Sequence, residues 1–559
     1  MLTSEQDNFV KMYERSFRNN WELEAITDYG TTNTLTYGRL AAQIARVHLL
    51  FKQYHIKKDD KIAVMGRNNC NWVTVYLATV TYGAIIVPIL QDFKPNDAQH
   101  IINHSGSKML FVTDMIWEGM DLEQMEAVKA VYSLANFKLI ATRLHKEITW
   151  GTVEDLFIKA YPKGFKPESV VYDERANSEV ASINYTSGTT GFSKGVITPC
   201  NALASHIKFF GATGLQYPGC RHVAFLPLAH AYGCIVDFLG SLAHGGHTYF
   251  IGRTPSPKIL LQAFAEIHPT VVVSVPLIVE KIYRKQIVPL ISKPPVSWVM
   301  KVPLLDEVIL TKIREQLMNA FGGEFKQLIL GGAPLNAEVE AFMRRIKFPL
   351  TVGYGMTECA PLISVSFYPE VELYSAGKIL DGFMEARIDS PNEEGIGEIQ
   401  VRGEHVMYGY FRNDQATKET FTKDGWLKTG DLGYIDENGF LFIKGRNKTM
   451  LLGANGQNIY PEEIEAKLNN MPYVMESLVI QHKDGALIAL VYPDYDAVDA
   501  VGLDSDGLEA AMEQNRHDLN QVVGSYEQIN KIRLYPHEFE KTPKKSIKRF
   551  LYTSMAEEK

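Results

Sequence analysis

Short apolar runs alternate with longer amphipathic segments through most of the chain. The short runs have the length expected of buried strands, and the segments between them, such as residues 40–54, show helical periodicity. This alternation predicts an α/β fold with largely parallel sheets. The predicted strands are Lys61–Met65, Ala84–Ile89, Lys108–Val112, Val271–Val275 and Gln327–Leu330.

The most apolar long run is Val73–Leu90, which reads VTVYLATVTYGAIIVPIL. Its length alone would suit a membrane span. The run is interrupted, however, by threonines, tyrosines, Gly83 and Pro88. A buried helix followed by a strand explains this composition better than a membrane span does. We therefore expect a soluble protein.

The pattern changes near residue 398. Glu398–Arg402 reads as a strand, and two further strands, Gly433–Asp436 and Leu441–Lys444, flank the pair Asn438-Gly439. Asn-Gly between apolar runs is a strong hairpin signal. These features predict a small β-rich subdomain over residues 378–447.

A second change follows Arg446. Pro461 and two acidic residues predict a helix start there, because the first turn of a helix favours proline and negative charge. Leu478–Gln481 and Ala486–Tyr492 predict another hairpin, and the chain ends after a basic run, Lys541–Arg549. A small α+β C-terminal domain is therefore expected from about residue 449.

Composition narrows the possible functions. The 559 residues exceed what one core usually serves, so two or more domains are expected. A net charge of −8 argues against a nucleic-acid-binding surface. The five cysteines form no CxxC pair, which argues against a disulfide framework or structural zinc. The polar stretch 1–17 has no secretory pattern, so we expect a cytoplasmic protein.

The stretch Tyr185–Val196 reads YTSGTTGFSKGV. Glycines allow close backbone approach, and N–H groups, hydroxyls and a lysine together favour a phosphate. The Walker A pattern fails twice, because Ser193 stands where glycine is required and Gly195 where Ser or Thr is required. A P-loop kinase or ATPase is thus a weaker alternative, and an ordinary flexible loop is another.

Further motifs occur in order along the chain: Leu35–Tyr37, Asn71–Pro88, Leu226–His230, Gly331–Leu335, Gly353–Glu358, Thr429–Asp431 and Gly445–Lys448. Together with the loop at Tyr185–Val196, they resemble the adenylate-forming superfamily of acyl-CoA synthetases, luciferases and peptide-synthetase adenylation domains. Leu226–His230 resembles the acyl-pocket motif of this family and is called the acyl motif below. The LPLAHAYG and TPxxxIKR variants are most similar to long-chain fatty acyl-CoA synthetases.

The resemblance implies two half-reactions. A carboxylate attacks the α-phosphorus of ATP to give acyl-AMP and pyrophosphate, and a thiol, that of coenzyme A, then displaces AMP. Such chemistry needs positioning and charge neutralisation. Glu358 would bind Mg²⁺, with Thr357 near the α-phosphate, although a solvated loop acid is the alternative. The residues implied for the phosphates are Thr186, Ser187, Gly188, Thr189, Thr190, Gly191 and Lys194.

For the nucleoside, the resemblance implies stacking of adenine on Tyr354, with Gly332, Ala333 and Pro334 forming the adjacent turn. A plain core aromatic is a serious alternative for Tyr354. Asp431 and Arg446 would bind the ribose hydroxyls. Taken alone, Asp431 in Thr-Gly-Asp would be interpreted as a turn residue.

Three further roles come from the resemblance. His230 would gate or position the acyl group, although a lone histidine is more often structural. Lys448 falls at the hinge about which the family's C-terminal domain rotates, which implies domains 1–447 and a mobile 448–559. An exposed surface lysine is the alternative there. Gly456 would line the coenzyme A tunnel.

The family's last catalytic lysine is the main departure. Alignment on Thr542-Pro543 and Ile547–Arg549 places Ser546 at its position, with Lys545 one residue away. We expect Lys545, or less favourably Lys548, to replace it, since a flexible amine can cover several ångströms. Otherwise Lys194 and Mg²⁺ would carry adenylation, or this half-reaction would be impaired. A basic run that merely contacts anionic lipid or solvent is the remaining alternative.

The sequence therefore predicts an ATP- and CoA-dependent ligase acting on a medium- or long-chain fatty acid. Two alternatives stay open: an acyl-AMP ligase that loads a carrier-protein thiol, and a non-catalytic relative that binds nucleotide or acyl groups. No nucleic-acid partner is expected. Peripheral membrane contact and a homodimer are left open.

Overall fold

The computed structural model describes residues 7–186, 194–294, 305–452, 458–542 and 547–557. The described chain forms two compact units. The first comprises residues 7–186, 194–385 and 402–427, and the second comprises residues 386–401 and 428–557, with the gaps just given. Each unit is described by itself below.

One seven-stranded sheet of the first unit carries the predicted adenine turn, Gly332–Pro334, after its second strand, β13. Its strand order is β14-β13-β12-β10-β11-β1-β2, and its neighbours are parallel except for the pair β1–β2. The strands are β1 (Glu24–Asp28), β2 (Thr34–Thr36), β10 (Arg221–Ala224), β11 (His247–Phe250), β12 (Val271–Ser274), β13 (Gln327–Leu330) and β14 (Leu350–Val352).

The eight-stranded sheet carries the two strands that flank the predicted phosphate loop. Its order is β20-β9-β8-β4-β3-β5-β6-β7. The central strands are parallel, whereas β8–β9, β9–β20 and β6–β7 are antiparallel. The strands are β3 (Lys61–Met65), β4 (Ile85–Ile89), β5 (Met109–Val112), β6 (Ala130–Ser133), β7 (Leu139–Thr142), β8 (Val180–Thr186), β9 (Lys194–Pro199) and β20 (Gly409–Tyr410).

A third sheet of the first unit is short and antiparallel, with the order β15 (Tyr354–Gly355), β16 (Leu362–Val365), β17 (Lys378–Ile379). Polar caps start several of the unit's helices; the Asn69 side chain, for example, accepts the Trp72 N–H at 2.7 Å. The longer helices are α1 (Phe9–Asn19), α2 (Tyr37–Gln53), α3 (Cys70–Thr81), α4 (Pro95–Ser105), α6 (Trp150–Ala160), α7 (Cys200–Ala212), α10 (Pro257–Ile267), α11 (Pro276–Ile282), α14 (Leu305–Ala320), α15 (Ala337–Arg345) and α16 (Asp414–Thr420).

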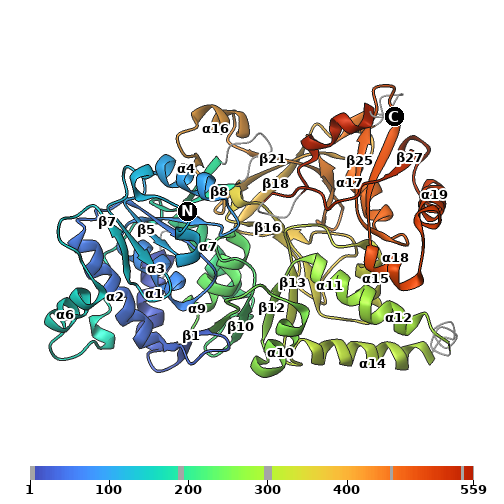
Figure 1. Cartoon of the computed structure of the whole chain (residues 1–559). Helices are drawn as coiled ribbons and strands as arrows, with labels where there is room; N and C mark the ends of the chain where they lie inside the picture. The colour runs from blue at the N-terminus through green and yellow to red at the C-terminus, as the bar shows by residue number, and fades with distance from the viewer. Residues whose placement is uncertain (1–6, 187–193, 295–304, 453–457, 543–546, 558–559) are drawn as a thin grey trace. The chain divides into compact units, whose positions relative to one another are not determined.

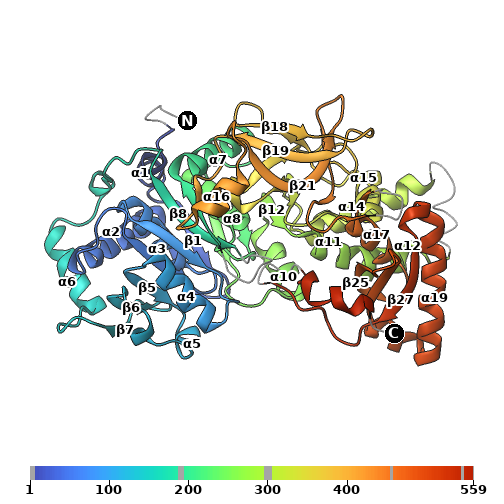
Figure 2. The same cartoon turned by 90° about the horizontal axis from the view of Figure 1, so that it is seen from above.

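Helices bury their apolar faces against both large sheets. Figure 1 shows α10 and α14 beside β10, β12 and β13, and the side chains of Phe264, Leu317 and Leu328 pack there in one core. Figure 2 shows α4 close to β5, and Ile101 and Leu110 belong to the core between them. A π-helix, Cys234–Gly240, follows the short helix α8 (Ala231–Gly233).

The second unit combines a four-stranded sheet with an α+β portion. The order β18-β19-β21-β22 comprises β18 (Met384–Asp389), β19 (Gly397–Gly403), β21 (Leu427–Ile435) and β22 (Leu441–Arg446). The remaining elements are β23 (Leu451–Leu452), β24 (Asn458–Ile459), α17 (Pro461–Leu468), β25 (Val474–Gln481), β26 (Leu487–Pro493), α18 (Tyr495–Val501), α19 (Ser505–Val522) and β27 (Ile529–Leu534).

Most elements expected from the sequence are confirmed. Val73–Leu90 divides into α3 and β4, the Asn438-Gly439 turn joins β21 to β22, and Pro461 opens α17. Among the described helices, none combines the length and apolar character that crossing a bilayer requires. The division into domains 1–447 and 448–559, and the subdomain 378–447, stay predictions.

Candidate active site

The ends of the predicted phosphate loop are fixed by a β-ladder in the first unit. Thr186 ends β8 and lies opposite Lys194, the first residue of β9. The ladder places both residues at one end of the strand pair. The predicted binding residues Ser187, Gly188, Thr189, Thr190 and Gly191 lie outside the described residues.

The Gly353–Glu358 motif contains β15 and the start of the tight turn that leads to β16. Thr357 and Glu358 lie in a 3₁₀ turn, and the Met356 N–H donates to the Pro361 carbonyl at 2.8 Å. A Cβ at Gly355 would collide with that same carbonyl group, so only glycine fits this close approach. Thr357 and Glu358 are half-buried, which leaves them partly open to solvent.

Tyr410 joins the predicted metal ligand to the predicted phosphate lysine. Its hydroxyl donates to Glu358 Oε1 at 2.9 Å, and Lys194 Nζ lies 4.7 Å from its ring centroid. Burial and the Glu358 carboxylate raise the pKa of Tyr410 well above its usual value, so the hydroxyl stays protonated and donates. The sequence prediction missed this residue.

The charged groups around Tyr410 fit magnesium and phosphate. In the part of the chain that the structure describes, Glu358 Oε2 has no hydrogen-bond or ion-pair partner, and Lys194 forms no ion pair. One carboxylate oxygen is therefore available to a hard cation, which proteins often bind through one or two carboxylates together with substrate phosphates. An unpaired ammonium on the same tyrosine suits the phosphate oxygens.

The predicted adenine turn lies at the end of β13. Gly332 adopts φ +86°, and Gly332, Ala333 and Pro334 are exposed. The Tyr232 hydroxyl donates to the Ile329 carbonyl at 2.9 Å, which links this strand to the residues just after the acyl motif. Tyr354 is half-buried in β15, so it is not a fully enclosed core residue.

The acyl motif is held by a side chain that the sequence prediction did not consider. Asn68 Nδ2 donates to the Leu226 carbonyl at 2.7 Å, and Asn68 Oδ1 accepts the Leu228 N–H at 2.9 Å. His230 follows at the start of α8, where it is half-buried and its N–H donates to the Pro227 carbonyl. This arrangement fixes the backbone beside His230.

The predicted ribose residues face each other in the second unit. Asp431 on β21 is paired in register with Arg446 on β22, and Arg446 Nε lies 3.1 Å from Asp431 Oδ1. Asp431 is 6% exposed, whereas the Arg446 side chain is 68% exposed. A buried acid beside an exposed guanidinium is a suitable arrangement for sugar hydroxyls, which both donate and accept.

The second unit also contains the predicted hinge and the basic run. Lys448 is exposed in the turn after β22. In the basic run, Lys541 Nζ pairs with Glu476 at 2.6 Å and Lys548 Nζ with Glu540 at 2.7 Å. Arg549 pairs with Glu465 of α17. Lys545, Ser546 and Gly456 lie outside the described residues.

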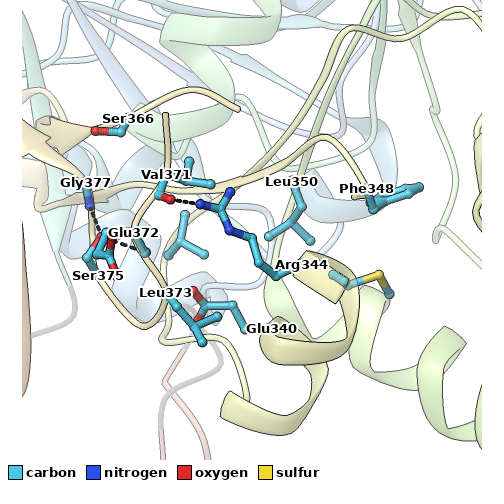
Figure 3. A pocket seen from close by; sticks show the side chains of 12 residues that line it. Glu340, Arg344, Phe348, Leu350, Ser366, Val371, Glu372, Leu373, Ser375 and Gly377 are labelled. Atoms are coloured by element: carbon cyan, nitrogen blue, oxygen red, sulfur yellow. Dashed lines mark hydrogen bonds between the residues drawn. The ribbon is translucent and has the colours of Figure 1, made fainter. Parts of the chain in front are cut away.

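A separate cavity of about 380 Å³, counting space open to solvent, lies beside α15. Figure 3 shows Arg344 reaching across it to the Val371 carbonyl, and Glu340 Oε1 accepts the Tyr374 N–H at 2.8 Å. Arg344 and Glu340 are thus both bonded to the segment Val371–Tyr374. None of the predicted site residues lines this cavity.

Comparison with known proteins identifies the family. Residues 13–411, well over half of the chain, match the family described as AMP-binding enzyme. The chain belongs to this family. The predicted resemblance to adenylate-forming acyl-CoA synthetases is confirmed, and the AMP-binding protein described here is a ligase of that superfamily.

Individual relatives agree over nearly the full length. The long-chain-fatty-acid–CoA ligase FadD15 of Mycobacterium bovis is 28% identical over 573 aligned residues, covering 93% of this chain and 90% of the relative. ATP-bound MatB from Rhodopseudomonas palustris is 23% identical with a TM-score of 0.77, covering 98% of this chain and 100% of MatB. MenE from Bacillus subtilis, in complex with ATP and magnesium ion, is 21% identical with a TM-score of 0.72, covering 97% of this chain and 98% of MenE. The two structures confirm the predicted fold class.

Proposed function

We propose that this AMP-binding enzyme activates a medium- or long-chain fatty acid with ATP and Mg²⁺, and transfers the acyl group to coenzyme A. The 28% identical relative is named a long-chain-fatty-acid–CoA ligase, and the related structures contain ATP or ATP with magnesium. Adenylation releases pyrophosphate, and thioester formation releases AMP.

One observation carries the proposal. Glu358 and Lys194 come from distant parts of the chain, and both contact Tyr410. A P-loop ATPase would also need a lysine and a metal, but its Walker A pattern is absent here. Among the described residues, one oxygen of Glu358 and the ammonium of Lys194 have no ion-pair partner, and this arrangement supports transfer at a magnesium-bound phosphate.

In the adenylation step, a fatty carboxylate oxygen attacks the α-phosphorus, and the bond to the β-phosphate oxygen breaks. Glu358 would hold Mg²⁺, which would supply neutralising charge for the phosphates. Lys194 binds the leaving pyrophosphate, with Thr186, Ser187, Gly188, Thr189, Thr190 and Gly191, and Thr357 orients the α-phosphate. Tyr410 keeps Glu358 in place through its hydrogen bond.

The nucleoside is bound by the remaining predicted residues. Tyr354 stacks on adenine beside Gly332, Ala333 and Pro334, and Asp431 and Arg446 bind the ribose hydroxyls. In the second step, rotation about Lys448 brings in the coenzyme A thiol, Gly456 lines its tunnel, and His230 positions the acyl group.

The lysine that assists adenylation is tested separately. Lys548 pairs with Glu540, but both side chains are partly exposed, and such pairs contribute only about 0–1 kcal/mol. The ion pair with Glu540 therefore leaves Lys548 able to act in adenylation. We expect Lys545→Ala to slow acyl-AMP formation far more than thioester formation from supplied acyl-AMP. Lys548→Ala tests the less favoured lysine, and Lys541→Ala, in the same basic run, is the matched control. Equal slowing of both steps by Lys545→Ala would contradict this assignment.

The activity is tested by pyrophosphate release from ATP with magnesium, across acids from acetate to palmitate, with and without coenzyme A. We expect AMP and pyrophosphate in equal amounts, highest with long chains, and sustained turnover only with coenzyme A. Release without turnover on coenzyme A would indicate a carrier-protein acceptor. No release with any acid, despite ATP binding, would favour a non-catalytic relative.

A further inference from the structure

Two histidines that are distant in the sequence stack in the interior of the first unit. His206 lies in α7 and His405 lies between β19 and β20, and both are 0% exposed. Their ring centroids are 3.5 Å apart, with 21° between the ring planes. Neither residue belongs to the motifs that predicted the function.

Both rings bond to the backbone of one residue, Leu362. The Leu362 N–H donates to His206 Nε2 at 3.0 Å, and His405 Nδ1 lies 2.8 Å from the Leu362 carbonyl oxygen. A peptide N–H can only donate and a carbonyl can only accept, so His206 carries its proton on Nδ1, and so does His405. His206 Nδ1 donates in turn to the Ala202 carbonyl at 2.6 Å.

The bond from the Leu362 N–H requires the His206 ring to be neutral. A second proton on His206 would remove the lone pair that accepts from Leu362, and it would place a charge in a closely stacked buried pair. Burial lowers the pKa of His206 well below its usual value and that of His405 to about 4. The geometry and the pKa values therefore agree.

Leu362 is the first residue of β16 and lies opposite Gly355 of β15. The turn between these two strands contains Thr357 and Glu358. The elements that supply the histidines also lead to the other site residues: α7 directly follows β9, which begins at Lys194, and His405 precedes β20, which contains Tyr410. The stacked pair thus connects three segments of the site through one backbone position.

We propose that His206 and His405 are a positioning pair that fixes the Glu358 turn for magnesium binding. The inference rests on the proposed function, because it assigns Glu358 to the metal. Without the pair, the turn spends less time in the competent position, and apparent affinity falls in proportion to that fraction. Both histidines are completely buried and bonded to the Leu362 backbone, so both act through Leu362.

The test compares His405→Leu with His405→Asn. Leucine removes the donor to the Leu362 carbonyl, whereas asparagine supplies an amide N–H at the δ position that Nδ1 occupies. His48→Leu is the matched control. His48 donates to the Ala78 carbonyl at 2.9 Å between α2 and α3, and its pKa is likewise lowered to about 4 by burial. His48 lies outside the elements that carry the candidate site.

Two quantities are measured on each full-length variant: the melting temperature, and the Mg²⁺ concentration for half-maximal ATP binding by calorimetry. We expect His405→Leu to raise that Mg²⁺ concentration by about fivefold, the effect of losing one hydrogen bond. His405→Asn should restore it to within about twofold. His48→Leu should lower the melting temperature and leave the Mg²⁺ requirement unchanged.

The proposal would be overturned if His405→Leu lowered the melting temperature as His48→Leu does but left the Mg²⁺ dependence unchanged. The histidine pair would then contribute only to packing. If His405→Leu does not fold, His405→Asn and His405→Gln decide, because glutamine cannot place its amide at the δ position and should raise the Mg²⁺ requirement. Calorimetry needs no turnover, so failure of the ligase assay in the wild type would count against the proposed function and not against the pair.

Discussion

The candidate magnesium residues of the first unit and the candidate ribose residues of the second unit are supported in different ways. Glu358 receives a hydrogen bond from Tyr410, which is 52 positions away, and its turn is bonded through Leu362 to His206, 156 positions from Leu362. Asp431 and Arg446 lie on adjacent strands of one hairpin, directly opposite each other. The first set depends on long-range contacts, and the second on a local one.

This difference predicts how far the effect of a substitution extends through the structure. Removing a buried long-range contact leaves a partner unsatisfied and also disturbs the segments that it connects. Removing the exposed Arg446 guanidinium should change little beyond its own hairpin, because the ion pair joins two adjacent strands and not distant segments. The first set should therefore show large, coupled effects, and the second smaller and separable ones.

The largest effect is expected for Glu358→Gln. The amide keeps the size of the side chain but removes the negative charge available to Mg²⁺, so carboxylate-dependent pyrophosphate release should fall by about 100- to 1,000-fold, the usual range for losing one preorganised charge-stabilising group. Glu385→Gln is the control, since Glu385 forms an exposed ion pair with Arg402. A loss of less than about tenfold would contradict the metal assignment of Glu358.

In the second unit, Asp431→Asn should raise the KM for ATP by about 10- to 100-fold, because a hydrogen bond to a buried charged group contributes about 1.5–3 kcal/mol. Arg446→Leu should raise it less than about fivefold, since the exposed guanidinium interacts more weakly. Steady-state kinetics at saturating acid and coenzyme A gives both values. Equal effects from the two variants would remove the distinction between the buried and the exposed partner.

The same difference explains how much of the fold the sequence predicted. The hairpin around Asn438-Gly439, the start of α17 at Pro461, and the change from α3 to β4 depend on residues close in sequence, and all three are confirmed. The family was recognisable because its motifs are continuous stretches. Asp431 and Arg446 were predicted by motif, and they are in contact across a ladder that the turn signal implied.

Long-range contacts could not be predicted in this way. Tyr410, Asn68, Tyr232 and the two stacked histidines all act through bonds to residues far away in sequence. Nothing in their immediate neighbours marks them, because a buried tyrosine or histidine has the same local pattern whether it bonds a site loop or only fills the core. Covariation between the two positions of each contact could have revealed these bonds, but covariation is a property of many related sequences and not of one.

Tyr410→Phe separates the two contacts of this residue. Phenylalanine keeps the ring near Lys194 and loses only the hydroxyl that donates to Glu358, so the Mg²⁺ concentration for half-maximal activity should rise about fivefold. Tyr410→Leu, which also loses the ring, should raise the KM for ATP as well. If Tyr410→Phe leaves the Mg²⁺ dependence unchanged, the hydroxyl does not position Glu358, and the long-range support reduces to the histidine pair.

The smallest expected effect is a loss of local stability at low pH around the stacked histidines His206 and His405. His405 has a folded-state pKa of about 4, with His206 and Glu404 as its charged or titratable neighbours. An unfolded histidine titrates near 6.5, so as pH falls below that value the opened state takes up a proton that the folded state does not. Stability attributable to His405 is therefore full above about pH 6.5 and falls by about 0.7 kcal/mol between pH 7 and 6. Hydrogen exchange of the peptide containing Leu362, corrected for intrinsic rates, should accelerate about threefold more over this interval in the wild type than in His405→Asn, which keeps only His206. The β21–β22 hairpin, where Asp431 and Arg446 pair without a buried histidine, should show no such acceleration. Equal acceleration in both regions would mean that the acid response belongs to the whole fold and not to the stacked pair.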